Sequence, residues 1–216
     1  MSPGEAVRTY FRTRVPARRF LPLAFLLAFA SVGGSAPASG PGFAVAVLLA
    51  WTLVVQFRLW DDLADRHQDR ARHPERVLSR ASALWPFYGT GFVAGVVNLL
   101  LIAFRAGAGG RLAVFGLLLG GFAFWYGGLR TPTPSVLRHH VVLIKYPAFV
   151  YLVSAPSALQ RPRVLILAMG LVYLALCLYE PLHDPEVASA PGARVTMAAA
   201  ALAFVAVAAL MLRTLL

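Results

Sequence analysis

Acidic residues are scarce in this chain, and they are unevenly distributed. The 216 residues include nine Asp and Glu side chains against 20 Lys and Arg side chains. Eight of the nine acids lie in two short stretches, residues 61–75 and 180–186, each at the end of a long apolar run. Acids that serve solubility are normally interspersed over the whole surface. The clustering therefore predicts a chemical role for these carboxylates.

Cysteine and histidine are also too few, or wrongly spaced, for several common sites. The only cysteine, Cys177, lies inside an apolar run, which excludes an intramolecular disulfide. No His-x-x-x-His pair occurs, so the repeated histidines of a membrane di-iron oxygenase are missing. Gly-x-Ser-x-Gly is also missing, which argues against a serine hydrolase.

Composition and hydropathy indicate a membrane protein. Apolar residues make up 59% of the chain and charged residues 13%, whereas soluble domains contain about 25% charged residues. About 20 consecutive apolar residues cross the roughly 30 Å hydrocarbon core of a bilayer as a helix. Seven segments qualify, near residues 20–36, 41–60, 84–104, 111–129, 139–157, 163–182 and 193–214. We therefore expect an all-α, polytopic transmembrane bundle in which residues 1–216 form a single integral-membrane domain.

Basic residues are distributed asymmetrically between the two sides that seven spans would define. One side carries fourteen arginines, and the other carries five: Arg105, Arg111, Arg161, Arg163 and Arg213. Because cytoplasmic loops are enriched in basic residues, we expect both acidic stretches to face the cytoplasm at the cell membrane. The formal net charge of +11 also predicts contacts with anionic lipid headgroups. Nucleic-acid binding is not expected, because the arginines flank the spans and form no separate patch.

Four aspartates of the first stretch are spaced for one helix face. They are Asp61, Asp62, Asp65 and Asp69. At 100° per residue they fall within an arc of about 100° if the helix continues past residue 60. Such carboxylates repel one another, so the arrangement favours bound cations, and oxygen ligands suit Mg²⁺ or Ca²⁺. The alternative is a solvated helix end whose acids are neutralised by Arg58, Arg66, Arg70 and Arg72.

The second acidic stretch gives a weaker signal. Glu180 and Asp184 are four residues apart and would converge on a metal from a regular helix. Pro181 and Pro185 interrupt that helix, so on its own the stretch could equally be a loop that carries acids. Its importance is its expected position, because acids on two different helices can hold metals that bridge a diphosphate.

The two motifs occur in a recognisable order. Asp61-Asp62-x-x-Asp65-x-x-x-Asp69 ends the second span, and Glu180-x-x-x-Asp184 ends the sixth. This order resembles the two aspartate-rich motifs of the UbiA-type intramembrane prenyltransferases. The basic, proline-containing segment 72–78 and the segment 126–130 are similar to further family features, so the likeness covers roughly residues 20–190. The resemblance implies a UbiA-like fold and a Mg²⁺-dependent enzyme that acts on an isoprenyl diphosphate.

The chain departs from the family pattern in three ways. Asp61 stands where the family usually has asparagine, and Glu180 replaces the first aspartate of the second motif. The family typically has nine transmembrane helices, whereas this chain has seven candidates. The missing pair leaves one side of the substrate chamber open, and a homo-oligomer in which a second copy supplies the wall is one way to close it.

An isolated cation completes the candidate site. Lys145, the chain's only lysine, lies in an apolar stretch where an unpaired ammonium is unfavourable, so we expect a buried anion beside it. The alternative is that its side chain snorkels to the membrane surface. The resemblance implies six candidate metal ligands: Asp61, Asp62, Asp65, Asp69, Glu180 and Asp184. The candidate diphosphate-binding residues are Arg58, Arg72, Arg130, Lys145 and Tyr126. Those expected to be essential for catalysis are Asp62, Asp65 and Lys145.

Two classes of function remain at this stage. The first is a Mg²⁺-dependent enzyme that ionises an isoprenyl diphosphate and transfers the prenyl group to a lipophilic acceptor. Because Asp-Asp-x-x-Asp also occurs in terpene cyclases, cyclisation without an acceptor is a second reading of the same site. The other class is a cation-binding or transport protein. Transporters usually place ionisable ligands near the bilayer midplane, whereas these acids are expected at its margin.

Overall fold

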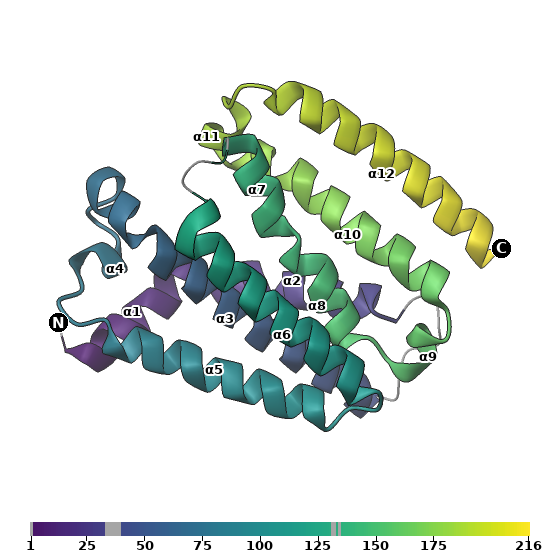
Figure 1. Ribbon diagram of the computed structural model, residues 1–216, viewed down its shortest axis with the longest axis horizontal. Helices are drawn as coiled ribbons and strands as arrows, with labels where there is room; N and C mark the ends of the chain where they lie inside the picture. The colour runs from purple at the N-terminus through teal and green to yellow at the C-terminus, as the bar shows by residue number, and fades with distance from the viewer. Residues whose placement is uncertain (1, 33–39, 131–132, 134) are drawn as a thin grey trace.

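A long central helix organises the molecule. The computed structural model describes residues 2–32, 40–130, 133 and 135–216, and every regular element in these ranges is helical. The elements are α1 (Pro3–Arg14), α2 (Ala17–Ala30), α3 (Gly40–Arg72), α4 (Val77–Arg80), α5 (Trp85–Ala103), α6 (Ala108–Phe124), the π-helical turn η1 (Trp125–Leu129), α7 (Ser135–Leu143), α8 (Lys145–Val153), α9 (Pro156–Leu159), α10 (Pro162–His183), α11 (Pro185–Ala188) and α12 (Ala193–Leu215). Helix α3 packs against α2, α5 and α8, whereas α12 lies at the edge of the bundle along α10 (Figure 1).

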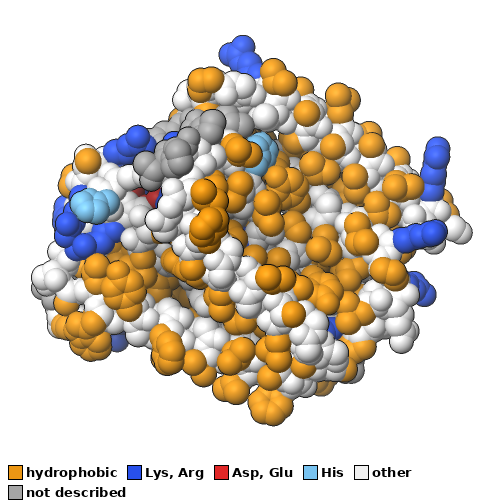
Figure 2. Space-filling view, viewed as in Figure 1, with side chains coloured by type: hydrophobic (Ala, Val, Ile, Leu, Met, Phe, Trp, Pro, Cys, Tyr) orange, Lys and Arg blue, Asp and Glu red, His pale blue; other side chains and the backbone are white. Residues whose placement is uncertain are grey.

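Five helices are long and apolar enough to cross a membrane. They are Gly40–Arg72, Trp85–Ala103, Ala108–Leu129, Pro162–His183 and Ala193–Leu215. Large hydrophobic side chains on these helices point outward, and Phe92 and Leu117 are 74% and 75% exposed. Figure 2 shows hydrophobic side chains across the middle of one face, with most of the Lys and Arg toward its two ends. The all-α prediction is confirmed, and the chain is a membrane-embedded helical bundle.

The two other predicted spans are not single long helices. In the segment near 20–36, α2 has 14 residues. At 1.5 Å per residue it is about 21 Å long, which is shorter than the hydrocarbon core. Residues 33–39 lie outside the described part. The segment near 139–157 is divided at Ile144 into α7 and α8. Pro147 has no N–H to donate to the Leu143 carbonyl, and α7 ends at Leu143. The structure therefore supports five spans by length and leaves the count of seven as a prediction.

The hydrophobic core ends where the first acidic motif begins. Leu49, Leu53 and Phe57 of α3 are fully buried. The Phe57 ring packs against Phe122 and Phe149, with ring centroids 5.5 and 5.2 Å apart. Because Asp61 follows Phe57 by about one helical turn, this aromatic layer lies directly beneath the carboxylates. It separates the polar end of α3 from the rest of the bundle.

Candidate functional site

The polar end of α3 is enclosed by other elements. Helix α3 continues without interruption to Arg72, as the spacing predicts, so the four aspartates share one face. Asp61, Asp62 and Asp69 are 7%, 3% and 7% exposed. The helix end is therefore not solvated at these three positions, whereas the neutralisation that this alternative expected does occur at Asp62, which pairs with Arg58. Isolated carboxylates are strongly destabilised by burial, so each requires a compensating partner.

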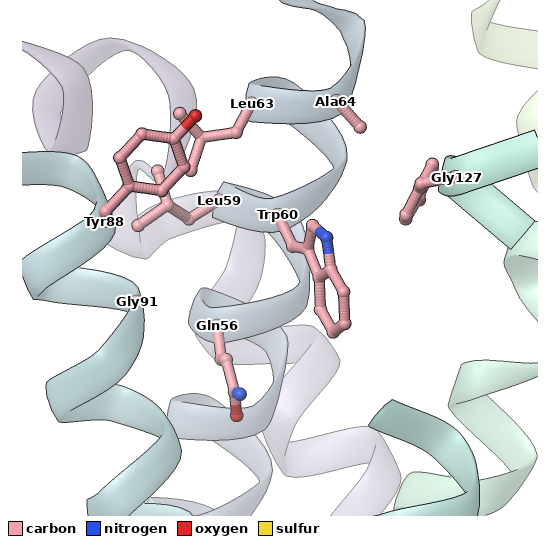
Figure 3. Close-up of a pocket in the computed structure, with 9 residues that line it drawn as sticks. Gln56, Leu59, Trp60, Leu63, Ala64, Tyr88, Gly91 and Gly127 are labelled. Carbon is pink, nitrogen blue, oxygen red and sulfur yellow. The ribbon is translucent and has the colours of Figure 1, made fainter. Parts of the chain in front are cut away.

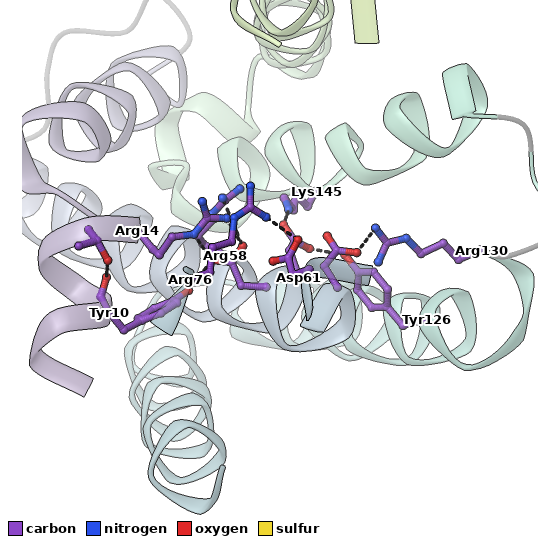
Figure 4. Close-up of polar contacts among 12 residues, drawn as sticks. Tyr10, Arg14, Arg58, Asp61, Arg76, Tyr126, Arg130 and Lys145 are labelled. Atoms are coloured by element: carbon purple, nitrogen blue, oxygen red, sulfur yellow. Dashed lines mark hydrogen bonds and ion pairs between the residues drawn. The ribbon is translucent and has the colours of Figure 1, made fainter. Parts of the chain in front are cut away.

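Asp61 is held by two residues that the sequence analysis placed at the site. The Lys145 ammonium, at the first residue of α8, and the Tyr126 hydroxyl, in η1, donate to its two carboxylate oxygens (Figure 4). Lys145 is 3% exposed, so the snorkelling alternative is wrong. Its ammonium also lies 5.8 Å from the Phe122 ring centroid and 5.5 Å from that of Tyr146. The expected buried anion is thus, in this structure, the Asp61 carboxylate.

Asp62 is bound by the amino-terminal helix. Arg14 of α1 donates to both carboxylate oxygens, over 2.7 and 3.1 Å, and the Tyr10 hydroxyl donates to one of them over 2.8 Å. Arg58, one turn back along α3, lies 3.3 Å away. Tyr10 is 1% exposed, and its burial together with the Asp62 carboxylate raises the pKa of its phenol well above the usual range. The phenol therefore stays protonated and acts as a donor.

Asp65 and Asp69 complete the series. Arg130, at the end of η1, forms an ion pair with Asp65. Arg76, immediately before α4, donates to Asp69 over 2.5 Å. Each of the four aspartates therefore faces at least one cation, and the cations come from five parts of the chain. We call these nine charged residues the charge cluster: Asp61, Asp62, Asp65, Asp69, Arg14, Arg58, Arg76, Arg130 and Lys145.

The charge cluster is not internally satisfied. Five cations face four carboxylates, so its formal charge is +1. Two guanidinium N–H groups, at Arg58 Nε and Arg130 Nε, are buried without a hydrogen-bond acceptor among the described residues. Buried groups of this kind are normally satisfied by protein, water or a ligand.

The second acidic stretch lies at the same end of the bundle. Helix α10 continues through Pro181 to His183, so Glu180 is helical and Asp184 caps the helix. Glu180 Oε2 lies 3.9 Å from His139 Nε2 of α7. Helix α8 packs against both α3, which carries Asp61, and α10, which carries Glu180. The two predicted acid sets thus lie on either side of α8. Among the described residues, Glu180 pairs with His139 and with no cation of the charge cluster.

The metal prediction rests on the kind of donor present. Among the described residues, no three or more His, Cys, Asp or Glu side chains come together as ready ligands for one ion. The carboxylate oxygens have the chemistry that Mg²⁺ prefers. In this structure Arg14, Arg130 and Lys145 occupy the oxygens of Asp62, Asp65 and Asp61, so the donors suit Mg²⁺ in kind but form no ready site among the described residues.

Three residues of the site were missed from the sequence: Tyr10, Arg14 and Arg76. Tyr10 and Arg14 are four residues apart on one face of a short amphipathic helix, but that pattern does not name a partner.

Two residues considered in the sequence are exposed: Arg72, a diphosphate-binding candidate that lies outside the charge cluster, and His67. Arg72 is the last residue of α3, and the exposure of His67 is as expected for a residue off the acidic face.

An uncharged groove adjoins the charge cluster. It has a volume of about 470 Å³ and is lined by α3, by the first half of α5 and by η1. Tyr126 belongs to both places, because it lines the groove and its hydroxyl donates to Asp61. An apolar space and a charged site therefore meet at one side chain.

The chain matches no model of a known protein family, no curated protein and no solved structure.

Proposed function

We propose that this chain is a Mg²⁺-dependent intramembrane prenyltransferase that releases diphosphate from an isoprenyl diphosphate at the charge cluster. One observation carries the proposal. The cluster has an excess cation, and two of its buried guanidinium N–H groups, Arg58 Nε and Arg130 Nε, have no hydrogen-bond acceptor among the described residues. An anion would satisfy these donors, and divalent cations that accompany it would be attracted by the four carboxylates. The likeness to the UbiA-type enzymes supports the same reading and rests on the motifs alone.

The chain's own cations would stabilise the leaving group. The allylic C–O bond breaks with both electrons leaving on the diphosphate, and the acceptor then bonds to the carbon and loses a proton. Arg58 and Arg130 would donate to diphosphate oxygens, and Lys145 would exchange Asp61 for one of them. Mg²⁺ held by Asp61, Asp62, Asp65 and Asp69 would neutralise further charge on the departing group. Such electrostatic stabilisation is strongest where water is excluded.

The surroundings of the cluster would protect a reactive cation. Phe57, Phe122 and Phe149 form an aromatic layer directly below Asp61, and their faces attract positive charge. This layer would keep water from the allylic carbon.

Diphosphate release by the purified protein tests the proposal. The protein in lipid nanodiscs is incubated with Mg²⁺ and prenyl diphosphates of several chain lengths. Release is expected for at least one chain length and should stop when EDTA is added. The variant Asp65→Asn should lose most of the activity. Glu75→Gln is the matched control, because Glu75 is exposed in the same segment and pairs only with His73 among the described residues. Equal activity of Asp65→Asn and Glu75→Gln would reject the site.

We also propose that the bundle has seven spans and that the charge cluster faces the cytoplasm. The support is the arginine asymmetry together with the position of both acid sets at one end of the bundle. Cysteines introduced as His67→Cys and Val187→Cys in a Cys177→Ala background test the orientation. Both should react with a membrane-impermeant maleimide only from the cytoplasmic side. Labelling from opposite sides would separate the two acid sets.

Product analysis distinguishes transfer from cyclisation. The uncharged groove beside Tyr126 offers space for a second molecule, and this space favours transfer. A cyclic hydrocarbon or alcohol formed at full rate from prenyl diphosphate alone, in lipid-stripped detergent, would establish the cyclase reading instead. Mg²⁺ binding or flux without diphosphate release from any substrate would support the cation-binding or transport class.

A further inference from the structure

The groove beside the charge cluster has no charged lining. Its walls include Gln56, Trp60 and Ala64 of α3, Tyr88 and Gly91 of α5, and Gly127 of η1. Figure 3 shows Gln56 and Trp60 on α3 between Tyr88 on one side and Gly127 on the other. Trp60 and Tyr126 have ring centroids 6.1 Å apart, so one aromatic layer separates this space from Asp61. The lining suits an uncharged molecule and not a diphosphate.

A polar ladder between α3 and α5 ends in this groove. Asn98 of α5, which is completely buried, accepts from the Thr52 hydroxyl and donates through Nδ2 to Gln56 Oε1 over 2.7 Å. Gln56 Oε1 is therefore occupied. Among the described residues, nothing accepts a hydrogen bond from Gln56 Nε2, and Gln56 is 8% exposed. The ladder fixes the Gln56 amide so that its N–H groups remain available to the groove.

A glycine leaves room for this amide. A Cβ added at Gly95 would lie 3.1 Å from Gln56 Nε2, which is tighter than an ordinary contact. To make room for this Cβ, the Gln56 amide would have to shift by a few tenths of an ångström. In contrast, a Cβ added at Gly127 would meet nothing within 4 Å, so that wall of the groove is open. The amide and the open space can therefore be altered separately.

We propose that this groove binds the lipophilic acceptor of the proposed transfer through a neutral oxygen that accepts a hydrogen bond from Gln56 Nε2. The identification of the occupant as a substrate rests on the proposed function. The occupant is a bilayer-soluble, uncharged molecule whose apolar body carries a carbonyl, ether or hydroxyl oxygen. Gln56 precedes Asp61 by five residues, about 7.5 Å along the helix, so the occupant lies beside the charge cluster. Gln56 is a specificity-determining residue in this arrangement.

Photo-crosslinking of the full chain in nanodiscs tests the proposal without relying on activity. The probe is a decyl phenyl ketone that bears an alkyl diazirine, and the matched probe has a methylene in place of the carbonyl. The ketone should label peptides that contain the groove residues of α3 and α5. It should label them about five- to tenfold more efficiently than the hydrocarbon, as expected for one net hydrogen bond. Equal labelling by the two probes, or labelling only outside the groove, would overturn the proposal.

Three variants separate the hydrogen bond from the space. Gln56→Met should remove the preference for the ketone, Gly95→Ala should reduce it, and Gly127→Leu should reduce labelling by both probes. Thr90→Val is the matched control on α5, because among the described residues the Thr90 hydroxyl donates only to the Pro86 carbonyl of its own helix, and it should retain the preference. A Gln56→Met protein that is monodisperse and still prefers the ketone would contradict the assignment of Gln56.

Failure of the acceptor assignment and failure of the proposed function have different outcomes. Groove labelling that prefers the ketone, in a protein that releases no diphosphate, would reject the prenyltransferase and keep the binding site. Diphosphate release that is normal in Gln56→Met, with an unchanged KM for every active acceptor, would keep the enzyme and reject Gln56. For an active acceptor we expect Gln56→Met to raise the acceptor KM about tenfold and to leave the prenyl diphosphate KM unchanged.

Discussion

Both ends of helix α8 contact buried cations, but the two ends use them differently. Lys145 begins the helix and meets Asp61. At the other end, Arg105 and Arg111 donate to the backbone carbonyls of Val153 and Ser154. Cations near a helix carboxyl terminus are stabilised by the helix dipole, whereas a cation at the amino terminus is opposed by it. Arg105 and Arg111 therefore have a sufficient structural role, and Lys145 is placed against the local preference.

The comparison also shows that a buried arginine is not by itself a site. Arg111 is fully buried, and its Nε has no hydrogen-bond partner among the described residues. Among the described residues, neither Arg105 nor Arg111 forms an ion pair. Burial lowers the pKa of Arg105. What distinguishes the charge cluster is the combination of unsatisfied donors with four carboxylates on one helix face. The predictions below test whether that difference corresponds to function at one end and stability at the other.

The largest effect is expected from the acid at the centre of the cluster. Asp62→Asn keeps the size of the side chain and removes the charge that Arg14 and Arg58 face. Turnover should fall by about 10²–10³-fold, as when a strong electrostatic contact to a transition state is lost. Diphosphate release measures the effect, with the amount of folded protein determined by size-exclusion chromatography. Near-normal turnover in folded Asp62→Asn would reject the catalytic role.

A double substitution separates a functional ion pair from a structural one. Lys145→Met and Asp61→Asn should each reduce turnover by roughly 100-fold. Removing one partner of a buried pair also destabilises the fold, while removing both is often neutral. The double variant should therefore regain thermal stability and remain inactive. Recovery of activity together with stability would show that the pair serves folding only.

The opposite end should respond in stability alone. Arg111→Met removes hydrogen bonds to the carbonyls of Ala106 and Ser154. The expected loss is about 2 kcal/mol, within the range for hydrogen bonds that involve a charged group. Thermal unfolding in detergent should occur at lower temperature, and turnover per folded molecule should be unchanged. Arg111→Lys, which keeps the charge but loses the planar guanidinium, should recover part of the stability. A large loss of turnover in folded Arg111→Met would remove the contrast between the ends.

The smallest effect is expected at the amino-terminal helix. Tyr10→Phe removes the hydroxyl that donates to Asp62 and keeps the packing of the ring on Phe87. One hydrogen bond is worth about 1 kcal/mol, so turnover should fall by about fivefold. Thr13→Val is a control on the same helix, because the Thr13 hydroxyl bonds only its own helix backbone among the described residues. Equal turnover of the two variants would mean that Tyr10 does not position Asp62.

Local patterns in the sequence predicted the membrane-embedded, all-helical fold and the shared face of the aspartates. Apolar length identifies a helix that suits a bilayer, because unpaired backbone groups are unfavourable in lipid. The spacing of Asp61, Asp62, Asp65 and Asp69 identifies one face, because the helical period is the same in every helix. The same reasoning selected Lys145, since a lone ammonium in an apolar stretch requires an anion.

The tertiary structure alone decided which groups meet these aspartates. Tyr10 and Arg14 reach Asp62 across about 50 residues of sequence, and Thr52, Asn98 and Gln56 form one ladder across two helices. No periodic signal names such partners, because they depend on how whole helices pack. The sequence thus determined where the charge lies along each helix. The packing determined whether that charge is solvated, neutralised or left with unsatisfied hydrogen bonds, because these outcomes depend on distances between separate elements.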